Sequence, residues 1–267
     1  MSTFAPSQQV TASFPDLKGK AVLITGASTG IGAAAARAFG RNGAKVAVNY
    51  NASRAEAQSV VDDIQANGGE AVLVQADVNQ PDAASRVIQE TVAAFGRLDV
   101  LVNNAGALIK RTPVTEYTDE FVDAVLDINV RQVVRFMREG AAQMRKQGRG
   151  GAIINLSSIA ARNGGGPGSV IYAASKGFIA TATRGWAKEL VKDRIRVNAV
   201  SPGVIMTPFH ERFSTAEQLA AMQATIPMDR LGGPEDCVGA FLYLASEQMG
   251  GYVTGQIIEV NGGQYMP

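Results

Sequence analysis

Two residue types that build many metal and redox sites are almost missing from this chain of 267 residues: it has one cysteine and one histidine. A lone cysteine excludes a disulfide within the chain and fits a reducing compartment. Cys237 stands in an apolar helical stretch, which predicts a buried, inert thiol. The lone histidine, His210, excludes any site that needs two histidine ligands, and we expect no metal centre.

Net charge is also nearly missing, because 25 lysines and arginines face 24 acidic residues and leave a formal charge of +1. Such a balance lacks the electrostatic footprint of a protein that binds nucleic acid or an anionic membrane, so we expect neither partner. No apolar run approaches the ~20 residues that a membrane span needs. The polar N-terminal segment lacks the apolar core of a secretory signal. We therefore expect a cytoplasmic protein.

What the chain does contain is a regular alternation of short apolar runs and helical patterns. Continuous Val, Ile and Leu blocks are typical of strands that are buried on both faces. The alternation predicts an α/β fold, a Rossmann-type doubly wound parallel sheet with helices on both faces. Strands are expected at 21–25, 45–49, 71–75, 98–103, 152–156, 195–200 and 256–260, and helices at 33–41, 55–66, 83–95 and 121–144.

The chain shows no internal break after its first residues. Residues 1–18 are polar, contain two prolines and are expected to form a flexible leader. Residues 19–267 are expected to form a single dinucleotide-binding catalytic domain. A stretch near 207–226 contains several apolar residues and is expected to cover the substrate as a lid.

The strongest local motif is the glycine-rich segment Thr-Gly-Ala-Ser-Thr-Gly-Ile-Gly at 25–32, which follows a strand and opens a helix. Gly26 allows a tight turn, Gly30 lets the backbone approach a pyrophosphate, and Gly32 lets the helix pack close to the strand. The intervening Ser28, Thr29 and Ile31 are expected to line the same site. An ordinary turn is the alternative, because the glycine spacing differs from G-x-G-x-x-G.

The second expected strand ends without the acidic residue that commonly binds the ribose 2′-hydroxyl of NAD. In its place stand Tyr50, Asn51, Ser53 and Arg54. A polar and basic loop can accept a 2′-phosphate that a carboxylate would repel. NADP(H) is therefore the preferred cofactor, with NAD(H) as the alternative, and Arg54 as a plain surface residue is the competing interpretation.

Polar and small residues also follow the third and fourth expected strands. Asp77, with Val78 beside it, could accept a hydrogen bond from an adenine amino group or could cap the following helix. Asn104, Ala105 and Gly106 are expected to line the adenosine half of the cofactor and to tie neighbouring strands together.

A possible chemical centre follows the fifth strand. Tyr172 and Lys176 are four residues apart and share one face of a helix. A tyrosine hydroxyl has an ordinary pKa near ~10, and a neighbouring ammonium is expected to lower that pKa. Such a tyrosine can exchange a proton with an alcohol or a developing alkoxide. Ser158, at the preceding strand end, can donate a hydrogen bond to the same oxygen.

Together these motifs resemble the short-chain dehydrogenase/reductase family over about residues 19–263. The resemblance is carried by TGASTGIG, NNAG, Ser158, YAASK, Ser201-Pro202-Gly203 with Thr207, and Val253-Thr254-Gly255-Gln256. It implies a seven-stranded sheet and a serine, tyrosine and lysine centre. It also implies that Asn129 holds a water in a proton relay from Lys176. Lys176 would hold the nicotinamide ribose, and Tyr172 would contact the cofactor as well.

Further expectations follow from the same resemblance. Pro202, Gly203, Ile205 and Thr207 would contact the nicotinamide half of the cofactor. The chain would form a homotetramer, with a homodimer as the alternative. Its function would be the reversible reduction of a ketone or aldehyde to an alcohol by hydride transfer from NADPH.

The chain departs from the family pattern in one place. The segment between Ser158 and Tyr172 is one residue longer than the commonest pattern and is rich in glycine, which leaves Ser157 as an alternative to Ser158. Three other functions stay open: a 3-oxoacyl reductase, an NAD-linked sugar or steroid dehydrogenase, and a catalytically silent nucleotide sensor.

Overall fold

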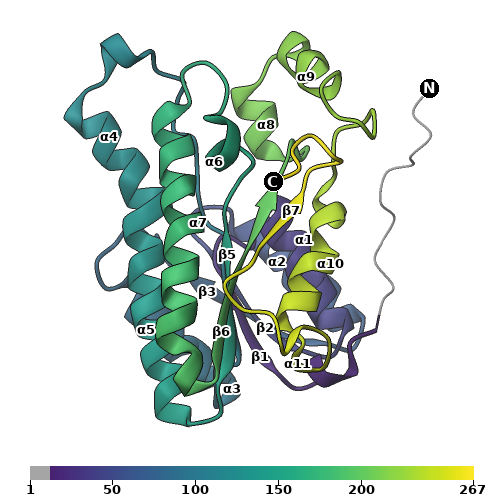
Figure 1. The fold of residues 1–267 in the computed structure, drawn as a ribbon. Helices are drawn as coiled ribbons and strands as arrows, with labels where there is room; N and C mark the ends of the chain where they lie inside the picture. The colour runs from purple at the N-terminus through teal and green to yellow at the C-terminus, as the bar shows by residue number, and fades with distance from the viewer. Residues whose placement is uncertain (1–12) are drawn as a thin grey trace.

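Seven parallel strands form one sheet at the centre of the molecule (Figure 1). The computed structural model describes residues 13–267, except for the side chains of residues 210–212. The strand order is β3-β2-β1-β4-β5-β6-β7, which confirms the expected doubly wound sheet. The strands are β1 (Ala21–Ile24), β2 (Lys45–Tyr50), β3 (Glu70–Gln75), β4 (Val100–Asn103), β5 (Gly151–Leu156), β6 (Ile195–Pro202) and β7 (Ile257–Val260).

Helices cover both faces of the sheet and divide the core into two clusters. On one face lie α1 (Gly30–Arg41), α2 (Arg54–Ala66) and α10 (Pro234–Ala245). On the other face lie α3 (Ala83–Phe95), α5 (Gln132–Gln147) and α7 (Val170–Leu190). The inner strands are buried along both faces, which explains why their sequences read as continuous apolar blocks.

The helix expected over 121–144 is interrupted, which the sequence pattern did not indicate. It consists of α4 (Asp119–Leu126), a π-helical segment (Asp127–Arg131) and then α5. Asn129 lies inside the π-helical segment with its side chain buried. A π-helical turn keeps the apolar faces of both flanking helices in place, so hydrophobic periodicity alone does not reveal it.

Part of the expected leader packs against the rest of the chain. Residues 1–12 of the expected leader lie outside the described residues, but the rest of it is packed. Leu17 is buried, and the Asp16 carboxylate accepts hydrogen bonds from the Ser246 hydroxyl and the Glu247 amide at the start of α11 (Glu247–Gly250). The carboxylate therefore caps a distant helix and anchors this end of the chain.

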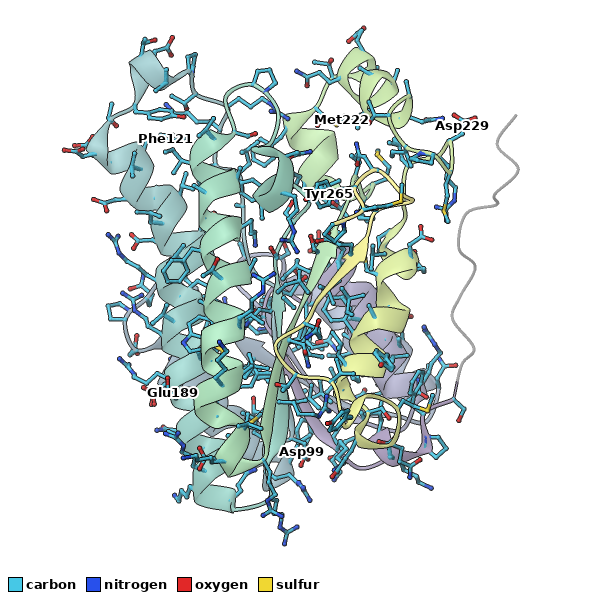
Figure 2. The ribbon with its side chains drawn as sticks, in the orientation of Figure 1. Asp99, Phe121, Glu189, Met222, Asp229 and Tyr265 are labelled. Atoms are coloured by element: carbon cyan, nitrogen blue, oxygen red, sulfur yellow. The ribbon has the colours of Figure 1, made fainter. Side chains whose placement is uncertain are left out.

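The carboxyl ends of the strands all point to one end of the sheet, where α8 (Pro208–Phe213) and α9 (Ala216–Gln223) lie (Figure 1). Figure 2 shows Met222 of α9 and Phe121 of α4 at this end, and Asp99 at the opposite end. Strand order reverses between β1 and β4, and ligands of such sheets bind in the crevice at that point. The remaining helix, α6 (Ala160–Asn163), follows β5.

Outside this crevice, the structure describes the lone cysteine and the length of the helices. Cys237 is fully buried in α10, and burial raises the pKa of its thiol to about 12, as an inert core thiol requires. Over residues 13–267, no helix has the length and apolar character needed to cross a bilayer.

Candidate active site

The glycine-rich turn joins β1 to α1 in a conformation that needs glycine. Gly26 and Gly30 have φ values of 62° and 55°, in the left-handed region that side chains disfavour. Asn104 holds the turn from β4, because its Nδ2 donates to the carbonyl oxygens of Thr25 and Gly26 at 2.9 and 3.0 Å. The expected tie between neighbouring strand ends is therefore present in the side chain of Asn104.

The turn presents the N-terminus of α1 as a site for an anion. Thr29 is the N-cap residue, but its side chain makes no capping hydrogen bond to the helix. The amides of the first turn therefore have no side-chain acceptor of their own, and the helix dipole favours negative charge there. Ser28 and Ile31 are half-buried beside these amides. These residues fit the pyrophosphate of a dinucleotide.

The end of β2 is polar and basic, as the sequence indicated. Tyr50 is buried, and its hydroxyl accepts a hydrogen bond from Nη1 of Arg54 at 3.3 Å. Arg54 begins α2 and is exposed, as is Asn51, while Ser53 caps the helix without a side-chain hydrogen bond. The guanidinium is thus held at the end of β2.

Asp77 does not cap the helix that follows it. Its Oδ1 accepts the amide of Asn79 at 2.9 Å, and its carbonyl accepts the amide of Gln80, so it stabilises its own turn. The N-cap of α3 is Asp82. Val78 is buried against the second core cluster.

Tyr172 and Lys176 project from α7 toward the end of β5, as their spacing predicts. Tyr172 shares a hydrogen bond with the Ser158 hydroxyl. The Nζ of Lys176 donates to the Leu156 carbonyl at 2.9 Å and lies 5.8 Å from the centre of the Tyr172 ring. Tyr172 therefore lies between Ser158, which it contacts, and the ammonium of Lys176.

The adjacent Ser157 has a different role. It is buried, and its hydroxyl donates to the carbonyl of Lys176 at 3.0 Å. This bond fastens α7 to β5 and leaves Ser157 engaged away from the tyrosine. Of the two serines, the one that contacts Tyr172 is Ser158.

Asn129 and Lys176 converge on Gly106. A Cβ at Gly106 would lie 2.8 Å from Oδ1 of Asn129 and 3.1 Å from Nζ of Lys176. The Asn129 amide also binds both polar backbone groups of Ala107, donating to its carbonyl at 2.7 Å and accepting its amide at 3.1 Å. The π-helical segment therefore fixes the position of the chain that follows β4, next to the lysine.

Burial controls the ionisation of the central pair. It raises the pKa of Tyr172 to about 12, although the hydrogen bond with Ser158 acts in the opposite direction. Burial also lowers the pKa of Lys176 to about 8. The expected lowering of the tyrosine pKa is therefore wrong for this structure, because loss of hydration outweighs the hydrogen bond with Ser158. Tyr172 is protonated at neutral pH and can donate a proton.

The segment after β6 returns to the glycine turn. Gly203 donates its amide to the carbonyl of Val260, and Ile205 pairs with Gly232. The methyl group of Thr207 would lie 3.2 Å from a Cβ placed on Gly30, so the two segments are in close contact. Pro202 is buried at the end of the strand. This segment thus lies against the glycine turn and leads into α8.

Helix α8, within the expected lid, contacts the tyrosine directly. The ring of Phe209 lies 5.8 Å from that of Tyr172, and the ring of Phe213 lies 5.3 Å from that of Phe209. The sequence indicated an apolar lid but not this contact, because the contact joins residues that only the folded chain brings together. Arg111, which binds the end of the same helix, was also missed in the sequence.

Comparison with known proteins places this geometry in a family. A family model described as Enoyl-(Acyl carrier protein) reductase matches residues 26–264. A 3-oxoacyl-[acyl-carrier-protein] reductase of Staphylococcus aureus is 40% identical over 247 residues, covering 92% of this chain and 98% of the relative. An L-rhamnose 1-dehydrogenase (NAD(P)(+)) of Sphingomonas sp. is 40% identical over 254 residues, covering 94% of this chain and 98% of the relative.

A solved structure agrees with both sequence matches. The NADH-dependent reductase A1-R′ complexed with NAD superimposes with a TM-score of 0.84 at 37% identity, covering 95% of this chain and all of the other. A match of this extent in sequence and fold, together with the site described above, identifies the chain as a member of the short-chain dehydrogenase/reductase family of NAD(P)(H)-dependent oxidoreductases.

Proposed function

We propose that this oxidoreductase reversibly reduces a ketone or aldehyde to an alcohol with NADPH, and that Tyr172 is its general acid and base. The observation that carries the proposal is that Tyr172 shares a hydrogen bond with Ser158 and lies beside Lys176, at the same end of the sheet as the glycine turn. A bound nicotinamide supplies or accepts the hydride.

The residues of the chain manage the proton and the developing charge. In reduction, the protonated Tyr172 hydroxyl donates its proton to the substrate oxygen as negative charge develops there. The Ser158 hydroxyl, which contacts Tyr172, donates a hydrogen bond to the same oxygen. In oxidation the tyrosine receives the proton of the alcohol, and the neighbouring Lys176 ammonium stabilises the resulting phenolate.

Asn129 is proposed as the fourth member of the site, holding a water that links Lys176 to solvent. Its Oδ1 faces Gly106 on the same side as the lysine Nζ, which supports this role. Its bonds to Ala107 give it a second task, which is to position the backbone after β4.

The preference for NADP(H) over NAD(H) depends on Arg54. Replacing Arg54 with alanine is expected to raise the Kd for NADPH about tenfold and to leave the Kd for NADH unchanged, because only the 2′-phosphate needs the guanidinium. Fluorescence titration with both cofactors measures this. Arg138→Ala, which removes an exposed arginine of α5, is the matched control. Equal affinities for the two cofactors in the unaltered protein would contradict the preference.

A substrate panel tests the function itself. We expect NADPH-dependent turnover, followed by nicotinamide absorbance, with aldehydes, simple ketones or acetoacetyl coenzyme A, and oxidation of the matching alcohols. The relatives named above make two outcomes specific: turnover of the thioester alone would indicate a 3-oxoacyl reductase, and NAD-linked oxidation of L-rhamnose would indicate a sugar dehydrogenase. Cofactor binding with no turnover across the panel would indicate a nucleotide sensor.

Two further expectations stay predictions. The homotetramer, with the homodimer as its alternative, follows from the family alone, since the structure contains one chain. The cytoplasmic location stays an expectation from the cysteine content, the charge balance and the apolar pattern of the sequence.

A further inference from the structure

Arg111 joins two segments that border the proposed substrate site. Its Nε donates to the carbonyl of Phe213, the last residue of α8, at 3.0 Å. Its Nη1 donates to the carbonyl of Pro167, in the glycine-rich loop before α7, at 3.0 Å. The next residue strengthens the second link, because the amide of Thr112 donates to the carbonyl of Gly168 at 2.9 Å.

One of the two joined segments lies over the proposed general acid. The ring of Phe209, at the other end of α8, packs on Tyr172, and Phe213 packs on Phe209. A shift of α8 would therefore move the ring that packs against the proposed general acid. Arg111 touches neither the tyrosine nor any reacting atom, and it acts on the site through α8.

The acceptors of Arg111 are two neutral carbonyl oxygens, and among the described residues it makes no ion pair. The planar guanidinium can reach two acceptors at once from one side chain, which a lysine ammonium on its flexible stem does poorly. The geometry of the bond pair, rather than charge neutralisation, thus explains an arginine at this position.

The backbone on both sides of these hydrogen bonds has an unusual geometry. Ile109 has a φ of 68°, and a β-branched residue in the left-handed region is strained. On the opposite side, a Cβ at Gly168 would lie 3.0 Å from both the Cβ of Arg111 and the amide nitrogen of Thr112. The glycine-rich loop therefore lies close enough to accept these bonds only because this position lacks a side chain.

We propose that Arg111 is a positioning residue that holds α8 and the glycine-rich loop together above Tyr172, and that it thereby sets the affinity of the enzyme for its carbonyl substrate. The inference rests on the proposed function for its kinetic consequence. The clasp itself, the two hydrogen bonds that join α8 to the loop, is tested without turnover.

Hydrogen exchange of the intact protein, with no substrate added, tests the clasp. Arg111→Ala is expected to raise the amide exchange rates of peptides covering 208–213 and 164–169 about tenfold, since hydrogen bonds to a charged group are lost at both ends. The matched control is Lys110→Ala, which removes the neighbouring exposed cation that lies over the Phe121 ring. Unchanged exchange in Arg111→Ala, or an equal rise in the control, overturns the proposal.

Kinetics with acetoacetyl coenzyme A and NADPH test the consequence. We expect the KM for the thioester to rise about tenfold in Arg111→Ala, with kcat and the Kd for NADPH each within about twofold. Arg111→Lys should show a smaller rise in KM, because lysine can replace only one of the two hydrogen bonds. It also provides a second variant in case the alanine variant does not fold. A fall in kcat at constant KM overturns the positioning role. If acetoacetyl coenzyme A is not turned over at all, the proposed function fails on that substrate while the exchange result still decides the clasp.

Discussion

Replacing Tyr172 with phenylalanine should lower kcat at least about 10³-fold while the Kd for NADPH stays within about twofold. General acid and base catalysis contributes ~10²–10⁴-fold, and the phenylalanine ring removes the only atom of the side chain that exchanges a proton. The ring itself is kept, so the packing of Phe209 against it should survive. Binding should survive as well, because the glycine turn and the α1 N-terminus lie on other elements.

The measurement is a pair of experiments on the same variant: turnover on the best carbonyl substrate and fluorescence titration of NADPH. Tyr252→Phe is the matched control. It removes the same hydroxyl from a tyrosine whose side chain is fully exposed. Retention of more than about a tenth of the activity would exclude Tyr172 as the general acid. Loss of cofactor binding together with activity would point instead to a structural defect.

Placing a methyl group on Gly32 should nearly abolish cofactor binding and destabilise the protein. A Cβ there would lie 2.5 Å from Nδ2 of Asn104 and 2.5 Å from the carbonyl oxygen of Gly26. The Gly26 oxygen cannot move easily because it belongs to the backbone. The Asn104 amide cannot move easily because its Nδ2 donates to that same oxygen. We expect the Kd for NADPH to rise at least about 100-fold, and the free energy of unfolding to fall by about 1–3 kcal/mol, as overpacking commonly costs.

Gly239→Ala provides the comparison, because it makes the same change in a helix, on α10, where a Cβ would meet nothing within 4 Å. That variant should be slightly stabilised, by roughly 0.5–1 kcal/mol, from the higher helix propensity of alanine. NADPH titration and thermal unfolding of both variants measure the difference. Similar NADPH affinity in the two variants would show that close packing at Gly32 does not shape the cofactor site.

The sequence predicted the elements of the sheet because buried parallel strands carry an unambiguous signal. Every expected strand is present within two residues of its expected ends, from Ala21 in β1 to Val260 in β7. The break at Asp127–Arg131 was missed because a π-helical segment adds one residue to a turn without removing the apolar stripe on either side. The early packing of Asp16 was missed because its partners are more than 200 residues away.

For the candidate site, the sequence alone determined which residue types stand at the strand ends and on one face of α7. These follow from local spacing: Tyr172 and Lys176 are one helical turn apart, and the glycines at 26, 30 and 32 follow a strand. It favoured Ser158 but left Ser157 as an alternative, because local spacing does not show which of two neighbouring side chains faces the tyrosine. The contact of Tyr172 selects Ser158.

Only the tertiary structure decided how the site is enclosed and how it ionises. Burial depends on every element that surrounds a group, so the pKa of Tyr172 rises although a lysine lies near it. The clasp made by Arg111 joins residues about 50 and 100 positions away in the chain, and no local pattern records such a contact. Spacing along the chain thus specified the reacting groups, whereas their environment came from contacts that exist only after folding.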